Sequence, residues 1–257
     1  MVTGVLPIAL ERATKTIQSL LLAGKEYVCV MRLHSDASVD EVKRVMNEFV
    51  GVIYQRPPLR SSVRRIVRKR TIYYIKILEI KDGYVLFRVG CQAGTYIRKL
   101  CHDVGEVLGV GAHMKELRRT RTGPFTEKDM LVSLYDLKYA STVYKEQKDE
   151  MYLRQIVQPV ESILSATPKI WIRDSAVNAL CHGADLAVPG ILRLESGIKP
   201  RDIVAIFTQK GEVVALAEAL MTTEDILNQN RGLAAKTRRV VMEQDTYPTL
   251  WRRKNVK

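Results

Sequence analysis

The segment Gly94–Leu100 holds residue types that could act on an anion. A helix is predicted from Tyr96 to about Leu108, with Thr95 as its N-cap, so Arg98 falls in the first turn. The positive end of the helix dipole disfavours a cation there by roughly 0.3–1 kcal/mol. An arginine at this place is best explained by a nearby anion, either a buried carboxylate or a phosphate. The alternative, a surface arginine with Tyr96 on the core, stays open.

Two other segments carry side chains of interest, and each is a weak signal alone. Tyr27 follows Lys25 and Glu26 at the start of a predicted strand, and a tyrosine there is ordinary. Leu117 and the basic residues after it follow the glycine-rich stretch 109–112.

Basic residues are clustered, and the formal net charge of the 257-residue chain is +13. Seven basic and no acidic residues fall in the stretch Arg56–Arg70, namely Arg56, Arg60, Arg64, Arg65, Arg68, Lys69 and Arg70. Pro57 and Pro58 argue against a helix, so a basic loop or hairpin is predicted there, leading into a strand over Thr71–Ile80. Further basic groups lie at 115–121, 236–239 and 252–254. This excess predicts a polyanionic partner, above all a nucleic acid.

Composition excludes several classes of protein. Hydrophobic residues make up 46% of the chain, which is enough to build a core and excludes a disordered chain. The apolar runs are far shorter than the roughly 20 residues that span a bilayer, and no leader is seen, so a soluble, unsecreted protein is expected. The four cysteines and four histidines show no zinc-ligand spacing, so no bound metal is expected.

The pattern of elements changes near residue 166. Before it, helices are predicted over Val5–Lys15, Ser38–Val50 and Asp149–Leu164, and strands over Tyr27–Leu33, Thr71–Ile80 and Tyr84–Cys91. Asp82-Gly83 favours a hairpin between the last two strands. After it, a helix over Ser175–Cys181 is followed by short strands with Gly and Pro turns, a pattern typical of a small β-barrel.

Taken together, the segments resemble the TruB-type pseudouridine synthases, and more closely their dyskerin branch, the catalytic subunit of box H/ACA particles. The matching stretches include VTGVLPIALERATK, AGKEYV, QRPPL, AGTYIRKL, GVGAHMKELRRTRTG and IRDSAVNALCHGADLAVPGIL. The resemblance implies an α+β fold with a mixed-sheet catalytic domain over residues 1–166. It also implies an RNA-binding PUA barrel over 167–250, followed by a basic tail over 251–257.

The resemblance also implies a reaction, the cofactor-free isomerisation of uridine to pseudouridine. Tyr27 matches the tyrosine that stacks on the flipped base, and Arg98 matches the arginine that pairs with the catalytic aspartate. Tyr96 and Leu117 match residues that line the uracil pocket. In the family that aspartate lies in a Gly-Thr-Leu-Asp-Pro-Lys stretch, and here it would fall two residues before Met1. The chain as given is therefore expected to be catalytically incomplete.

Partners are implied in the same way. The Arg56–Arg70 stretch matches the loop that closes over substrate RNA, and Arg118, Arg119, Lys236 and Arg238 are predicted to contact RNA. A box H/ACA guide RNA, substrate rRNA and tRNA, and three small proteins are expected partners: a zinc-ribbon-like protein, a glycine-arginine-type barrel protein and a kink-turn-binding protein. An archaeal, cytoplasmic setting without a membrane is expected. Two alternatives remain, a non-catalytic RNA-binding scaffold and a stand-alone tRNA-modifying synthase.

Overall fold

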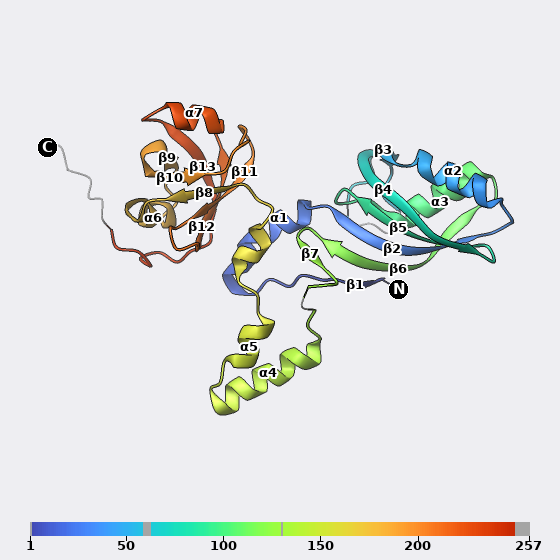
Figure 1. The fold of residues 1–257 in the computed structure, drawn as a ribbon, viewed down its shortest axis with the longest axis horizontal. Coiled ribbons are helices and arrows are strands. Elements are labelled where there is room, and N and C mark those ends of the chain that lie inside the picture. Colours follow the sequence, from blue (N-terminus) through green and yellow to red (C-terminus); the bar gives the residue numbers. More distant parts are fainter. Residues whose placement is uncertain (1, 59–62, 130, 250–257) are drawn as a thin grey trace. The chain divides into compact units, whose positions relative to one another are not determined.

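The computed structural model describes residues 2–58, 63–129 and 131–249 (Figure 1). By its internal contacts the chain divides into two compact units. The first comprises residues 1–7 and 21–148, and the second comprises residues 8–20 and 149–257. Residues 149–166 thus group with the second unit by contacts, whereas the domain boundary predicted near residue 166 stays a prediction.

The first unit is built on a mixed sheet of seven strands in the order β1-β6-β2-β5-β4-β3, with β7 paired to β6. Its strands are β1 (Val2–Gly4), β2 (Lys25–Leu33), β3 (Gly51–Gln55), β4 (Arg68–Lys81), β5 (Tyr84–Cys91), β6 (Ala112–Thr122) and β7 (Phe125–Thr126). Only the β1–β6 pair is parallel among the described strands of this sheet. Asp82 and Gly83 both have positive φ, 51° and 73°, as a two-residue hairpin turn requires, and they join β4 to β5 as predicted.

Two amphipathic helices, α2 (Val39–Glu48) and α3 (Ile97–Leu108), pack with the sheet around one core. Alternate residues of β2, Cys29, Met31 and Leu33, are buried in that core. The Ser38 side chain caps α2 by accepting a hydrogen bond from the Glu41 amide, as the sequence predicts. A further helix, α4 (Leu134–Gln147), follows the sheet and begins at a capping box on Ser133.

The second unit is a barrel-like sheet of six strands in the order β10-β8-β11-β12-β13-β9. Its strands are β8 (Lys169–Ile172), β9 (Leu186–Ala187), β10 (Ile191–Leu194), β11 (Ile203–Phe207), β12 (Val213–Ala219) and β13 (Leu233–Val240). Its helices are α5 (Met151–Ile156), α6 (Asp174–Cys181) and α7 (Thr223–Asn228), with 3-10 turns η1 (Glu11–Thr16), η2 (Val160–Leu164) and η3 (Val188–Gly190). The predicted α+β fold class, a mixed sheet followed by a small β-barrel, is confirmed.

Several predicted elements differ from those observed. The helix expected over Val5–Lys15 is wrong: regular structure begins only at Glu11, as the 3-10 turn η1, and continues as α1 (Ile17–Leu22). Pro7 disfavours a helical conformation in Leu6 before it, and Leu10 is extended, with φ −103° and ψ 144°, so η1 begins only after Leu10. The helix expected over Asp149–Leu164 is split into α5 and η2 around Pro159 for the same reason.

Candidate active site and RNA-binding surface

Tyr27 lies near the start of β2, directly between Val89 of β5 and Arg119 of β6 in the register of the sheet. Its side chain is half-buried and packs against the core of the first unit. Burial and the neighbouring Cys91 raise the pKa of the Tyr27 hydroxyl, and Arg119 offsets part of that rise. At neutral pH the phenol therefore keeps its proton, so it offers a flat ring for stacking and a hydroxyl that donates.

The segment Val2–Val5 is held against β6 next to this tyrosine. The Val5 amide donates to the Arg119 carbonyl at 2.8 Å, and Arg119 Nε donates to the Val5 carbonyl at 2.6 Å. Gly4 has a φ of +98°, and a Cβ there would lie 2.1 Å from the Arg119 carbonyl oxygen. Since β1 and β2 both flank β6, Val2–Gly4 lie about 10 Å from β2.

Leu117 joins the same part of the sheet. It pairs with Cys29 of β2 and, on its other side, with Val2 of β1. Leu117 and Tyr27 are both partly buried against the same core, and their cross-strand partners place them on one face. The structure thus brings these two predicted pocket residues together, while the pocket role itself stays a prediction.

Tyr96 is positioned through its main chain. Gln55, which is only 2% exposed, accepts a hydrogen bond from the Tyr96 amide at 2.9 Å and donates to the Tyr96 carbonyl at 3.2 Å. Tyr96 itself is the N-cap of α3, with extended backbone angles of φ −96° and ψ 101°. The predicted Thr95 cap is wrong, because the Thr95 hydroxyl donates to the Gln92 carbonyl at 2.7 Å and closes a turn instead.

Arg98 is the second residue of α3 and its side chain is exposed. It makes no hydrogen bond or ion pair with any residue that the structure describes. One turn later, Cys101 Sγ lies 3.7 Å from Cys29 Sγ, so the start of α3 packs onto β2 two residues beyond Tyr27. No described contact joins Arg98 to Tyr27 or Tyr96, and its pairing with a carboxylate stays a prediction.

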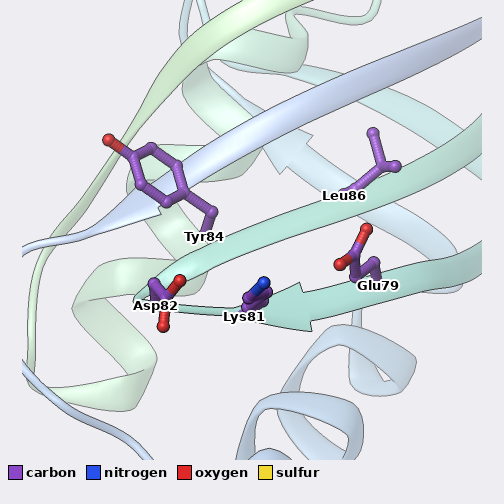
Figure 2. Close-up of a pocket in the computed structure, with 5 residues that line it drawn as sticks. All are labelled: Glu79, Lys81, Asp82, Tyr84 and Leu86. Atoms are coloured by element: carbon purple, nitrogen blue, oxygen red, sulfur yellow. The ribbon is translucent and has the colours of Figure 1, made fainter.

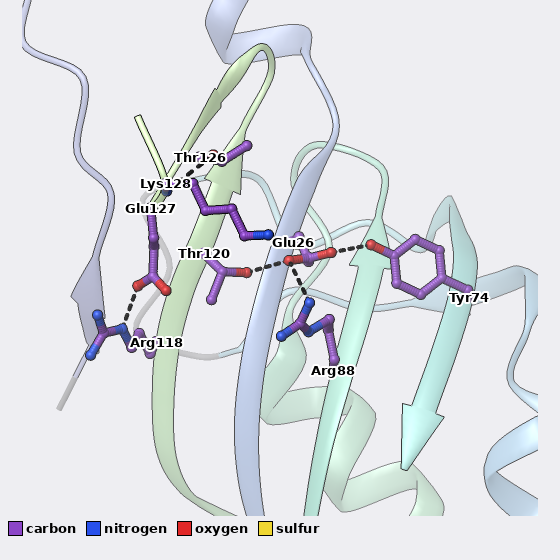
Figure 3. Close-up of polar contacts among 8 residues, drawn as sticks. All are labelled: Glu26, Tyr74, Arg88, Arg118, Thr120, Thr126, Glu127 and Lys128. Carbon is purple, nitrogen blue, oxygen red and sulfur yellow. Dashed lines mark hydrogen bonds and ion pairs between the residues drawn. The ribbon is translucent and has the colours of Figure 1, made fainter. Parts of the chain in front are cut away.

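Glu26, the neighbour of Tyr27, is the centre of a polar network that was not predicted from the sequence (Figure 3). The hydroxyl of Thr120 donates to its carboxylate at 2.6 Å, the hydroxyl of Tyr74 donates to the other oxygen, and Arg88 lies 3.9 Å away. Burial acts to raise the pKa of Glu26, but the hydrogen bonds from Thr120 and Tyr74, with the charges of Arg88 and Arg121, hold that pKa below its ordinary value. The ionised carboxylate ties β2 to β4, β5 and β6.

The predicted Arg56–Arg70 loop is only partly a loop. Arg68, Lys69 and Arg70 belong to β4, where Arg68 pairs with Gln55 and Arg70 with Ile53. The hairpin alternative is the one observed, since β3 and β4 pair antiparallel on either side of this stretch, but β4 begins at Arg68, three residues before the predicted start at Thr71. Arg56, Arg64 and Arg65 are exposed and precede the strand, while Arg60 lies outside the described residues.

The other residues predicted to contact RNA differ in whether their basic side chains are already paired within the protein. Arg118 is paired with Glu127 (Figure 3), and Arg119 is bound to Val5. Arg238 is paired with Glu218, with its Nε 3.0 Å from the carboxylate. Lys236 is exposed and makes no such pair within the described residues. Arg65 Nε donates to the Pro57 carbonyl at 3.3 Å, so the strongest candidates for free phosphate contacts are Lys236, Arg56 and Arg64.

A pocket lies at the opposite end of the sheet from Tyr27 (Figure 2). It is lined by Glu79, Lys81, Asp82, Tyr84 and Leu86 around the β4–β5 hairpin. Tyr84 pairs with Arg32, five residues along β2 from Tyr27, which is about 16 Å. None of the predicted site residues lines this pocket.

In the part of the chain that the structure describes, no three His, Cys, Asp or Glu side chains are grouped as metal ligands would be. Within the same residues, no helix is both long enough and apolar enough to span a bilayer.

Comparison with known proteins identifies the family. Three family models match in succession: the TruB family pseudouridylate synthase N-terminal domain over residues 1–97, the tRNA pseudouridylate synthase B C-terminal domain over 98–165 and the PUA domain over 168–241. The probable tRNA pseudouridine synthase B of Methanopyrus kandleri is 61% identical over 97% of this chain and 74% of its own length. The corresponding protein of Methanosarcina barkeri is 54% identical over 98% and 75%.

Solved structures agree with that assignment. A Cbf5-Nop10-Gar1 complex matches with a TM-score of 0.92 and 55% identity, over 97% of this chain and 76% of the other. An H/ACA RNP bound to a substrate RNA containing 2'-deoxyuridine matches with a TM-score of 0.90 and 52% identity, over the same shares of the two chains. The chain therefore belongs to the TruB family of pseudouridine synthases, and it carries a PUA domain.

Proposed function

We propose that this chain is the pseudouridine-forming subunit of an RNA-guided H/ACA ribonucleoprotein, acting on uridines in rRNA. The observation that carries the proposal is its similarity, over 97% of its length, to Cbf5 chains solved as H/ACA complexes. The half-buried Tyr27, placed beside Leu117 on the face that packs against α3, gives a uracil ring a surface on which to stack.

The reaction requires three changes at one nucleotide. The bond between N1 of uracil and C1′ of ribose breaks, the base turns, and C5 bonds to C1′. A base then takes the proton from C5 and N1 takes up a proton, so the net change is an isomerisation. Positive charge builds at C1′ during cleavage, and a carboxylate stabilises or traps it. The target base must leave its stack to reach such a group.

Three side chains of the first unit fit individual steps of this reaction. The Tyr27 ring stacks on the displaced base, and because its phenol keeps its proton, its hydroxyl acts first as a hydrogen-bond donor. Arg98, exposed and unpaired among the described residues, has a guanidinium free to hold a carboxylate ionised. Leu117 supplies the apolar side of the pocket.

Partners follow from the same similarity. The related solved complexes contain Nop10, Gar1 and RNA, and we extend partners of that kind to this chain. In such a particle, base pairing with a guide RNA selects the target, and the protein binds backbone phosphates without reading sequence. The basic residues before β4 and Lys236 are suited to that role.

The test is an RNA modification assay with matched arms. The 257-residue chain and an N-terminally extended chain, in which Gly-Thr-Leu-Asp-Pro-Lys takes the place of Met1, are each assembled with partner proteins and incubated with an rRNA fragment. Each reaction is run with a matched guide RNA, a mismatched guide or none, and pseudouridine is mapped by position.

We expect the extended chain to modify only the uridine specified by the matched guide, and the 257-residue chain to bind the RNA with far lower turnover. Modification of a tRNA transcript without any guide would instead support the stand-alone activity that the names of the relatives suggest. Binding without modification by the extended chain would support a scaffold and reject the catalytic proposal.

A further inference from the structure

A basic groove in the second unit lies between the N-terminal 3-10 turn η1 and strand β13. Arg12 of η1 fixes one wall of this groove. Its Nε donates to the Val241 carbonyl at 2.9 Å, a second nitrogen donates to the Met242 carbonyl at 3.1 Å, and a third is 3.0 Å from the Glu243 carboxylate. Segments more than 220 residues apart in sequence are thereby held side by side.

The groove has a volume of about 340 Å³, and its lining carries positive charge only. Six residues line it, namely Thr14, Lys15, Gln18, Arg238, Arg239 and Val240. No carboxylate is among them, and the one nearby acid bound to this set, Glu218, is already occupied by Arg238.

Two basic side chains of the groove have no partner among the described residues. The side chains of Lys15, on η1, and Arg239, on β13, make no hydrogen bond or ion pair with any residue that the structure describes. The same holds for the Gln18 side chain, which can donate two hydrogen bonds. Lys15 is only partly exposed, so part of its charge is removed from bulk water and gains more from a bound anion than a fully exposed lysine would.

We propose that this groove, formed by Lys15, Gln18 and Arg239, binds a backbone phosphate of the RNA held by this unit, and the proposal rests on the RNA-binding function proposed above. An arginine fork suits the paired oxygens of a phosphodiester, and the lysine adds a point charge from the opposite wall. The contact fixes the position of the RNA without reading its sequence. Arg239, rather than its paired neighbour Arg238, is the residue of β13 that contacts this phosphate.

RNA binding by the whole chain, measured as a function of salt, tests the groove. A fluorescently labelled H/ACA guide RNA is titrated with wild type, with Lys15→Ala/Arg239→Ala and with Lys199→Ala/Arg231→Ala, between 50 and 400 mM KCl. The control pair removes the same charge from two exposed residues of the same unit that do not line the groove.

Loss of two phosphate contacts is expected to reduce the slope of log affinity against log salt by about 1.4–1.8, and affinity at 0.1 M salt by at least about 10-fold. The control pair should change the slope by less than about 0.5, and the charge-conserving Lys15→Arg/Arg239→Lys should keep it near wild type. Since both side chains lack partners in the described structure, the fold is expected to persist, which circular dichroism checks.

The outcomes separate the two proposals. If wild type binds the RNA but the groove variant matches the control pair in slope and affinity, the groove proposal is overturned and the RNA-binding function stands. If wild type shows no salt-dependent binding at all, the proposed function itself fails.

Discussion

Replacing Glu26 should weaken the first unit far more than replacing an exposed glutamate. Its carboxylate is 15% exposed and accepts hydrogen bonds from Tyr74 and Thr120. A hydrogen bond to a charged group contributes about 1.5–3 kcal/mol, and the loss of the acceptor leaves partly buried hydroxyls unpaired. The Arg88 pair, at 3.9 Å and with its arginine half-exposed, adds at most about 1 kcal/mol.

Glu26→Ala is therefore expected to lower the free energy of unfolding of this unit by about 3–5 kcal/mol. Glu26→Gln keeps one carbonyl acceptor and should cost about half as much. The matched control is Glu48→Ala, which removes an exposed i,i+4 pair with Arg44 and should cost about 0.5 kcal/mol or less.

Amide hydrogen exchange is the suitable assay, because it reports on the stability of each strand separately. Peptides that cover β2 and β6 should exchange faster in the Glu26 variants, and peptides from β11 and β12 should not. Protection of β2 in Glu26→Ala within 0.5 kcal/mol of wild type would refute the reasoning.

The same network gives a pH dependence with a defined sign. The pKa of Glu26 is lower in the folded state than in the unfolded chain, where it is near 4.3. Its contribution is therefore fully present above about pH 4.3 and is lost as the pH falls through the folded-state pKa. The stability difference between wild type and Glu26→Gln should shrink in that acid range and stay constant from pH 6 to 8.

Three further changes are expected to act on the site. Gln55→Leu should lower the free energy of unfolding by about 1–3 kcal/mol, as measured by thermal denaturation, because the Tyr96 amide loses its hydrogen bond to Gln55 while the Tyr96 carbonyl keeps the one from the Leu100 amide. Gly4→Ala should detach β1 from β6, since its Cβ would lie 2.1 Å from the Arg119 carbonyl oxygen; faster exchange of the Val5 amide would show it, and unchanged exchange would count against the close approach. Arg98→Ala in the N-terminally extended chain should abolish turnover while RNA affinity stays within about threefold of wild type; near wild-type turnover would reject its role.

Elements with strong local signals were predicted well from the sequence. The Asp82-Gly83 turn and the β-branched strands that flank it fix the β4–β5 hairpin, and Ser38 marks the start of α2. Strand β6 was not predicted, because its run of basic and polar residues has no apolar alternation, although it pairs with β1, β2 and β7. Its place is set by partners on both sides rather than by its own composition.

The side chains that support the site depend on contacts distant in sequence. Gln55 reaches Tyr96 across 41 residues, and Glu26 reaches Tyr74 and Thr120 across 48 and 94. No local pattern indicates such pairs; the only signal was a charged residue inside a strand, beside the tyrosine already singled out. Tyr27 and Leu117 could be named through the family resemblance, and the structure shows that they share one face of the sheet.

The most direct measurement of the proposed chemistry is release of tritium from C5 of labelled uridine, because this proton leaves only when C5 bonds to C1′. The N-terminally extended chain and its Tyr27→Phe variant are compared in single-turnover reactions with a matched guide RNA. The Phe variant should still bind the RNA but release tritium at least about 100-fold more slowly, as expected for loss of a group that moves a proton. Release within twofold of the unsubstituted chain would contradict a catalytic role for the Tyr27 surface.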